Sequence, residues 1–141
     1  MSGEKSLILD ANILIRATLG TRVPDLLEKM SPFVRFFTPE ICVADAYKYL
    51  PPLLQKQGIN EKTSIASLDA VVRTVNVLDE EVYGLYQNAA RKRMRKRDID
   101  DWPIVACSLL LNCPIWTEDA DFFGSGVAIW TTDRVELYLE E

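Results

Sequence analysis

The stretch Leu7-Ile8-Leu9-Asp10-Ala11-Asn12-Ile13-Leu14-Ile15 decides how the rest of the sequence is interpreted. An apolar run ends at the acidic residue Asp10, and a helix-like segment begins directly after it. A carboxylate at the end of a buried parallel strand lies on the edge where open α/β sheets bind their ligands. Asp45, Asp101 and Asp119 also lie at the starts of helices or just past strands, and the four acids together indicate a metal site.

Short apolar runs and helical patterns alternate along the whole sequence. The apolar or β-branched runs predict five strands, at residues 7–10, 34–37, 74–78, 114–117 and 127–130. Helical spacing predicts helices that begin at residue 11, cover 39–50, 60–72, 79–97 and 101–112, and begin again after residue 133. This alternation predicts an α/β fold in which a mostly parallel sheet of about five strands is covered by helices on both faces.

Prolines and charges set the expected ends of two helices. Thr38 and Pro39 have the pattern of a cap followed by a first-turn proline, and the helix after them is expected to stop near Pro51-Pro52. Acidic residues at 79–81 and cations at 91–97 complement the dipole of the helix predicted between them.

The composition is that of an ordinary globular domain. The chain has 141 residues, of which 48% are hydrophobic and 26% charged, and we expect a single domain over residues 1–141. Its three cysteines form no C-x-x-C pair, so neither a disulfide framework nor a zinc ribbon is supported. The N-terminus has no long apolar segment, and no stretch approaches roughly 18 apolar residues. We therefore expect a soluble, cytoplasmic protein that does not associate with a membrane.

The acids would repel one another if folding gathers them in one pocket. Such crowding raises carboxylate pKa values unless a cation lies among them. Oxygen ligands select hard divalent ions, so Mg²⁺ or Mn²⁺ is the expected cofactor. The chain contains no histidine, which excludes a His-ligated zinc and a Ser/His/Asp triad. Metal-assisted attack on a phosphodiester requires only carboxylates from the protein, so an acid-only site indicates phosphoryl chemistry.

Each acid also has a purely structural explanation. Asp10 can cap the helix that follows it, and one of the acids at 98–101 can cap the helix before Pro103. Asp45 can be a solvated helix residue, and Asp119 can be a turn residue. The convergence of several strand ends in one crevice favours a shared site over these separate roles.

Four short segments resemble the PIN domain nucleases, including the VapC-type toxins. They are Leu9-Asp10-Ala11-Asn12, the helical acid Asp45 after Thr38-Pro39, the run from Asp98 to Ala106, and the run from Pro114 to Phe122. The match spans nearly the whole chain. The resemblance implies a three-layer α/β/α fold and a metal-dependent endoribonuclease that hydrolyses phosphodiester bonds in single-stranded RNA.

The resemblance also assigns roles to the acids. It implies that Asp10, Asp45, Asp101 and Asp119 form the catalytic cluster, and that Asp10, Asp101 and Asp119 bind the metal. Position 45 departs from the family pattern, in which glutamate is more usual. Because aspartate is one methylene shorter, Asp45 either binds metal through a water or does not bind it.

Supporting residues and partners follow from the same resemblance. Asn12 and Thr117 correspond to polar supports that orient ligands or the attacking water, and Asp98 and Asp121 are secondary candidates. The resemblance further implies a homodimer, and a toxin neutralised by a small antitoxin protein whose segment fills the active-site groove. The sequence itself does not distinguish a toxin from an RNA-processing enzyme.

Charge is segregated along the chain. The net charge is −5, which argues against a protein that coats nucleic acid by bulk attraction. Residues 91–97 nevertheless hold six of the 16 cations. We expect Arg95, Lys96 and Arg97 to guide an RNA backbone toward the acids through phosphate contacts, which supply position rather than sequence specificity. A solvated helix end is the alternative, because seven consecutive residues surround a helix and cannot all face one ligand.

Two other classes of function remain open. The first is a catalytically inactive PIN-like module that binds protein or RNA, for which the departure at Asp45 is the sequence support. The second is a phosphoreceiver signalling domain, because Asp79 follows Val77-Leu78 at a predicted strand end. The sequence lacks the acidic pair after the first strand and the lysine closing a late strand that such a domain needs.

Overall fold

The computed structural model describes residues 4–141 and contains one five-stranded sheet. The strands are β1 (Lys5–Leu9), β2 (Val34–Pro39), β3 (Asn76–Leu78), β4 (Ile115–Trp116) and β5 (Ile129–Trp130). All neighbouring strands are parallel, in the order β3-β2-β1-β4-β5. The predicted parallel sheet is confirmed. The predicted domain also includes residues 1–3, which lie outside the described residues.

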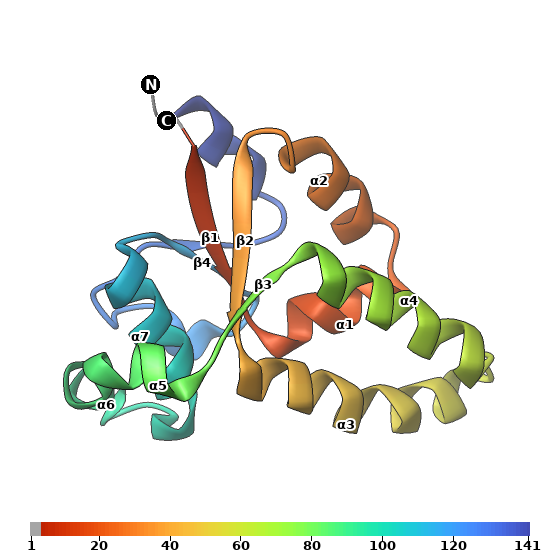
Figure 1. Cartoon of the computed structure of the whole chain (residues 1–141), viewed down its shortest axis with the longest axis horizontal. Coiled ribbons are helices and arrows are strands. Elements are labelled where there is room, and N and C mark those ends of the chain that lie inside the picture. Colours follow the sequence, from red (N-terminus) through yellow and green to blue (C-terminus); the bar gives the residue numbers. More distant parts are fainter. Residues whose placement is uncertain (1–3) are drawn as a thin grey trace.

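Helices cover both faces of this sheet. They are α1 (Ala11–Leu19), α2 (Arg22–Met30), α3 (Glu40–Gln57), α4 (Glu61–Thr74), α5 (Glu80–Tyr83), α6 (Gln87–Met94) and α7 (Trp102–Leu111), with short 3-10 helices η1 (Gly84–Tyr86), η2 (Ile99–Asp101), η3 (Ala120–Phe122) and η4 (Val135–Glu140). Helices α1 to α4 lie on one side of the strands and α5 to α7 on the other (Figure 1). The result is the three-layer α/β/α arrangement that was expected.

Strand β1 lies at the centre of the sheet. It pairs with β2 on one side and with β4 on the other, and Leu9 lies opposite Trp116 in the second pair. Leu7, Ile8 and Leu9 are fully buried, as a strand covered on both faces requires, which explains their uninterrupted apolar run. The residue after Leu9 therefore emerges between the ends of β2 and β4.

Helix α3 does not end at Pro51-Pro52, and the prediction that it would is wrong. It continues to Gln57 and ends where Gly58 takes a left-handed conformation with φ of 68°. Leu50 and Leu54 flank the prolines and are fully buried, in a helix that packs on α1 and α4. Burial of two leucines, at about 1.5–3 kcal/mol each, offsets much of the cost of the two interior prolines, which is roughly 3 kcal/mol each.

The join between β2 and α3 also differs from the expected cap. The Thr38 side chain does not cap α3, because its hydroxyl donates to the backbone carbonyl of Leu9 at 2.7 Å. Pro39 is the last residue of β2 and occupies the N-cap position without a side-chain cap hydrogen bond. Thr38 therefore fastens the end of β2 to the end of β1.

Three helical regions were predicted incorrectly. Helix α2 was missed, although Val23, Leu26 and Met30 show helical spacing and are all buried. The continuous helix expected over 79–97 is interrupted, with η1 beginning at Gly84 between α5 and α6, because glycine is a poor helix former. The segment after residue 133 forms the 3-10 helix η4 rather than an α-helix. Within residues 4–141, no helix is both long and apolar enough to cross a membrane.

The packing explanation for α3 predicts different effects at two adjacent leucines. Leu54→Ala should lower the free energy of unfolding by about 2–5 kcal/mol, because it leaves a cavity at a fully buried site. Leu53→Ala is the matched control, since Leu53 is 37% exposed and its truncation should cost much less. Urea denaturation measures both, and equal losses would contradict this account of how the helix tolerates its prolines.

Candidate active site

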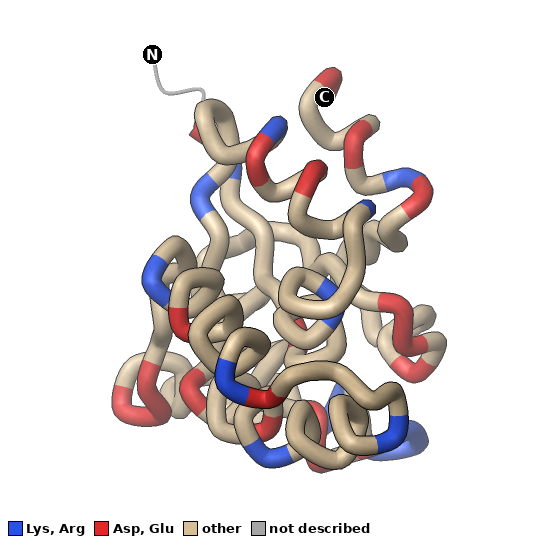
Figure 2. Tube along the Cα trace, turned by 90° about the vertical axis from the view of Figure 1, so that its right-hand side faces the viewer, with Lys and Arg blue, Asp and Glu red and all other residues tan. Residues whose placement is uncertain are grey.

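An acid-lined cleft of about 840 Å³ opens at the carboxyl ends of the central strands. Its acidic lining residues are Asp10, Asp45, Glu80, Asp98, Asp100, Asp101, Glu118 and Asp119. Acidic and basic segments both occur along the lower part of the molecule, the end to which the strands lead (Figure 2). All four acids predicted to form the cluster line this one cleft, so folding brings them together.

Asp10 is the most deeply buried of these acids, with 5% of its surface exposed. One carboxylate oxygen accepts the backbone N–H of Ile13 at 3.0 Å and so caps α1, and the other accepts the hydroxyl of Thr117. Burial raises the pKa of Asp10, although the hydrogen bonds from Thr117 and Ile13 oppose that rise. Asp10 is therefore both a helix cap and the fixed acid of the cleft.

Thr117 links two of the acids. Its buried side chain donates to Asp10, and the same hydroxyl oxygen accepts the backbone N–H of Asp119 at 3.0 Å. Thr117 does not itself line the cleft. It lies behind the two acids and connects the end of β1 to the end of β4.

Asp101 ends the short helix η2, directly before α7. Burial first, and then the negative charges of Asp98, Asp119, Asp10 and Asp121, raise its pKa to about 7. Asp98 begins the same turn and accepts the backbone N–H of Asp100 at 3.1 Å. The carboxylates thus repel one another across the cleft, and a bound cation would relieve that repulsion.

Asp45 faces the cleft from α3 and is half-buried. Cys42, three residues earlier on the same helix, is buried and also lines the cleft. Burial raises the pKa of the Cys42 thiol well above its usual value, and the charge of Asp10 raises it further. Cys42 is therefore a neutral thiol among the acids rather than an anionic ligand.

Asp119 follows β4 and has an exposed side chain. One of its carboxylate oxygens accepts the backbone N–H of Asp121 at 2.9 Å, which starts η3. Asp121, a secondary candidate from the sequence, is not among the residues that line the cleft. Its nearby charge nevertheless contributes to the raised pKa of Asp101.

The sequence prediction included one polar lining residue and missed another. Asn12 was predicted, and its amide oxygen accepts Nε–H of Arg16 at 2.8 Å. Arg16 was missed, although it is the only cation that lines the cleft within residues 4–141. Its position one helical turn after Asn12 was the available signal, because both then lie on the same face of α1.

The donor set suits a hard divalent ion, since it consists of carboxylates in a partly desolvated cleft. Across residues 4–141, however, no three Asp, Glu or Cys side chains are already grouped closely enough to hold a metal ion. The cleft is therefore a set of neighbouring acids rather than a preformed coordination sphere.

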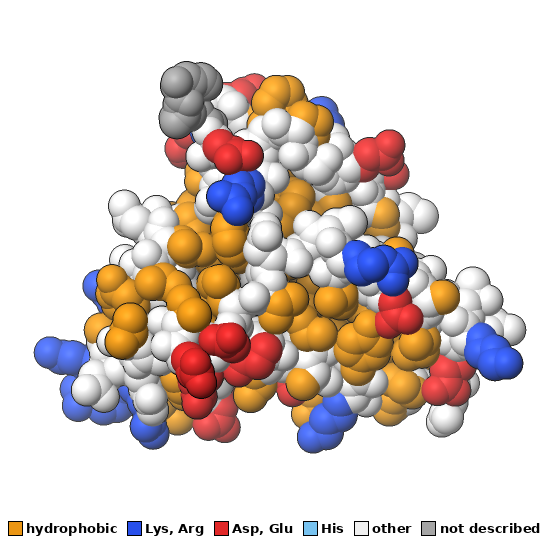
Figure 3. All heavy atoms as spheres, in the orientation of Figure 1, with side chains coloured by type: hydrophobic (Ala, Val, Ile, Leu, Met, Phe, Trp, Pro, Cys, Tyr) orange, Lys and Arg blue, Asp and Glu red, His pale blue; other side chains and the backbone are white. Residues whose placement is uncertain are grey.

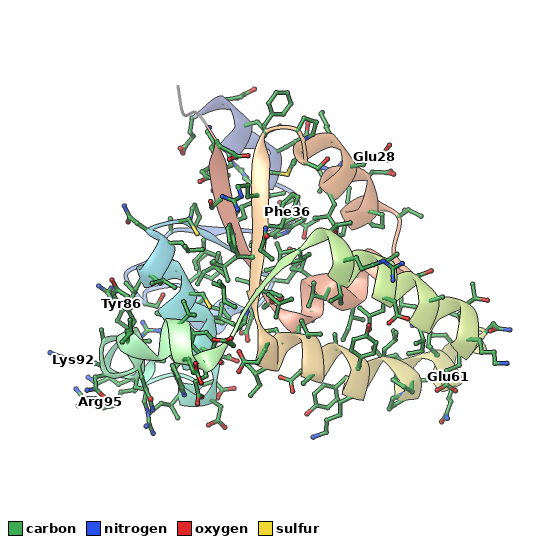
Figure 4. All side chains as sticks on the ribbon, viewed as in Figure 1. Glu28, Phe36, Glu61, Tyr86, Lys92 and Arg95 are labelled. Atoms are coloured by element: carbon green, nitrogen blue, oxygen red, sulfur yellow. The ribbon has the colours of Figure 1, made fainter. Side chains whose placement is uncertain are left out.

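The cations proposed to guide RNA lie beyond the end of α6 and outside the cleft lining. Basic side chains gather over α6 at the lower left of the molecule, and an acidic group lies nearer its centre (Figure 3). Lys92 and Arg95 point away from the fold (Figure 4). Arg97 instead donates through Nε to the backbone carbonyl of Phe123 at 3.2 Å, so it is already engaged with the protein.

The sequence model of the PIN domain family matches residues 8–140. This chain belongs to the PIN domain family. A comparison with curated protein sequences finds no match. Asp79, on which a phosphoreceiver interpretation would depend, precedes α5 and does not line the acidic cleft.

Solved structures agree with the PIN domain fold. A chain of VapBC2 from Rickettsia felis, bound to a DNA fragment from its promoter, is 15% identical with a TM-score of 0.66, covering 89% of this chain and 98% of that one. A chain of a toxin-antitoxin complex from Klebsiella pneumoniae is 20% identical with a TM-score of 0.57, and the match covers 89% of this chain and 97% of that one. PAE2754 from Pyrobaculum aerophilum is 14% identical with a TM-score of 0.67, and the match covers 99% of this chain and 94% of that one. At these identities the likeness concerns the fold.

The raised pKa of Asp101 predicts that this PIN domain is destabilised by its own site as the pH rises. A carboxyl group whose folded pKa is about 7, against 3.8 for the unfolded chain, stabilises the fold at low pH and loses that contribution as pH rises through 7. At pH 8, Asp101→Asn should therefore be more stable than wild type by about 1–2 kcal/mol, after allowance for solvent screening. The gain should shrink toward pH 4.

Denaturation at pH 4, 6 and 8 measures this difference. Asp25→Asn, an exposed change on α2 away from the cleft, is the control and should bring no gain. An Asp101→Asn variant less stable than wild type at pH 8 would show that the cleft carboxylates do not repel one another as described.

Proposed function

We propose that this PIN domain is a metal-dependent endoribonuclease that hydrolyses phosphodiester bonds in single-stranded RNA. The observation that carries the proposal is the position of buried Asp10, which shares one cleft with Asp45, Asp101 and Asp119. The chain has no histidine, so no imidazole base is available to the site. An acid cluster of this kind suits phosphoryl chemistry assisted by a divalent ion.

Asp10, Asp101 and Asp119 are the residues proposed to hold Mg²⁺ or Mn²⁺. When bound, such an ion stabilises charge on the phosphoryl group and lowers the pKa of water. Asp10 is held rigid by the Ile13 amide and the Thr117 hydroxyl, while Asp119 is tied to the same hydroxyl through its backbone. These hydrogen bonds fix the Asp10 carboxylate and the Asp119 backbone before an ion arrives, which reduces the cost of binding.

The other residues of the cleft are proposed to act on substrate and water. Asp45, shorter than the more usual glutamate, acts through a water molecule from α3. Asn12 positions Arg16, whose guanidinium can bind a phosphate of the RNA among the acids. Arg95 and Lys96 contact the RNA backbone outside the cleft, and Arg97 contributes less because it binds the Phe123 carbonyl.

We further propose that the protein is the toxin of a toxin-antitoxin pair. Its fold resembles a chain of the Klebsiella pneumoniae toxin-antitoxin complex and one of VapBC2, and family resemblance adds a homodimer and a small antitoxin partner. The proposed location is the cytoplasm, where its RNA substrates are found.

An inactive PIN domain that binds protein or RNA is the second candidate. Two observations favour it, namely the aspartate at position 45 and the absence of a ready-made group of three ligands among residues 4–141. Calorimetry with Mn²⁺ separates the candidates, because a nuclease must bind the ion at millimolar concentrations or below. Absence of binding would favour the inactive module.

The proposal predicts cleavage of labelled single-stranded RNA that requires Mn²⁺ or Mg²⁺ and stops with chelator. Asp10→Asn and Asp101→Asn should each reduce the rate by more than about 100-fold, since even changes behind metal ligands cost about 10–100-fold. Asp25→Asn, outside the cleft, is the matched control and should cleave at the wild-type rate. Activity that survives both cleft substitutions would refute the assignment.

Thr117 provides a second test of the same site. Thr117→Val keeps the shape but leaves one Asp10 oxygen and the Asp119 amide without this partner, so Mn²⁺ affinity or cleavage should fall about 10–100-fold. Thr117→Ser retains the hydroxyl and should remain within a few-fold of wild type. Equal loss in both variants would mean that packing, rather than hydrogen bonding, is the contribution of Thr117.

A further inference from the structure

Two arginines of the basic run donate hydrogen bonds to the backbone of a loop. Arg93 lies on α6, and Arg97 follows four residues later, just beyond the end of that helix. Nη1 of Arg93 donates to the carbonyl of Ser125 at 3.0 Å, and Nε of Arg97 donates to the carbonyl of Phe123 at 3.2 Å. Nη1 of Arg97 also donates to the carbonyl of Arg93 at 3.3 Å, which joins the two arginines. The guanidinium groups thus hold alternate carbonyls of the segment after η3.

A glycine follows each of these two carbonyls and makes room for a guanidinium group. Gly124 and Gly126 have φ values of 85° and 90°, which side chains rarely adopt. A Cβ atom on Gly124 would lie 2.5 Å from Nη2 of Arg97, and one on Gly126 would overlap Nη1 of Arg93. Glycine at both positions therefore allows the arginines to lie against the backbone of the turn.

The same loop carries Asp119 at its other end. Between the two ends, Phe122 is buried in the core, and the buried Ser125 donates its hydroxyl to the Phe122 carbonyl at 2.6 Å. The backbone N–H of Phe122 donates to the Asp119 carbonyl at 3.3 Å. A continuous series of contacts therefore runs from Arg93 on α6 and Arg97 just beyond it to the exposed acid at the cleft.

We propose that Arg93 and Arg97 are positioning residues that hold loop 119–126 against the end of α6 and thereby place Asp119 in the cleft. The proposal rests on the proposed nuclease function for its catalytic consequence. The proposal separates the cations of the basic run into two groups. Arg93 and Arg97 bind the loop, whereas Lys92 points away from the fold (Figure 4).

Steady-state cleavage of single-stranded RNA with Mn²⁺ tests the proposal. Arg93→Gln and Arg97→Gln should each lower kcat roughly 10- to 100-fold with little change in KM, because the acid is displaced while the RNA still binds. Lys92→Gln removes one positive charge from α6, as Arg93→Gln does, and should leave kcat and KM within twofold of wild type. Arg97→Lys keeps one donor for the Phe123 carbonyl and should recover part of the kcat.

Amide hydrogen exchange of residues 119–126 supplies a readout that does not need RNA cleavage. The two arginine-to-glutamine changes should speed exchange in this segment, and Lys92→Gln should not. Gly124→Ala is a second variant that disturbs the contact from the loop side and should have the same effect. Unchanged exchange in both arginine variants would overturn the proposal whatever the activity.

The remaining outcomes separate this proposal from the proposed function. Faster exchange with an unchanged kcat would show that the arginines stabilise the loop without positioning Asp119, which also overturns it. A wild type that cleaves no RNA would refute the nuclease function. Calorimetric titration with Mn²⁺ would then test whether the arginines position Asp119. In that case weaker Mn²⁺ binding in the arginine variants supports positioning, and equal binding overturns it.

Discussion

The site depends on a carboxylate that is buried at the end of the central strand. Asp10 cannot leave its place without losing the Ile13 amide and the Thr117 hydroxyl, and the apolar strand before it holds the backbone between β2 and β4. Burial raises the pKa of Asp10, so an ionised carboxylate at this position costs the fold stability. A carboxyl group buried where two strand ends meet, with a pKa shifted by that burial, is typical of sites built for function rather than for packing.

The sequence was sufficient to predict the structure where a residue's neighbours along the chain determine its environment. The apolar run before Asp10 predicted the central buried strand, and the alternation of runs and helical patterns predicted the parallel sheet. The rule that strand ends converge predicted that Asp10 and Asp119 share one cleft, whereas the family resemblance added Asp45 and Asp101 to the cluster. What each acid contributes to catalysis stays a prediction.

Errors arose where contacts distant in sequence override local preference. Pro51-Pro52 would end an isolated helix, but α1 and α4 hold Leu50 and Leu54 in place and the helix continues. The hydrogen bond from Arg97 to the Phe123 carbonyl was likewise not foreseen, because the two residues are 26 apart in the sequence. Nothing in the sequence of residues 91–97 distinguishes the cations that bind the protein backbone from those that face solvent. Such distinctions depend on the direction of each side chain in the folded chain.

The strand order has a consequence for how the protein behaves at high concentration. The edges of the sheet are β3 and β5, which are only three and two residues long. An edge strand exposes unpaired backbone groups that can add a strand from another molecule, and a short edge offers few of them. The longer strands β1 and β2 lie inside the sheet, where both of their edges are paired. The fold thereby limits aggregation through strand addition without placing proline or charged residues along a long open edge.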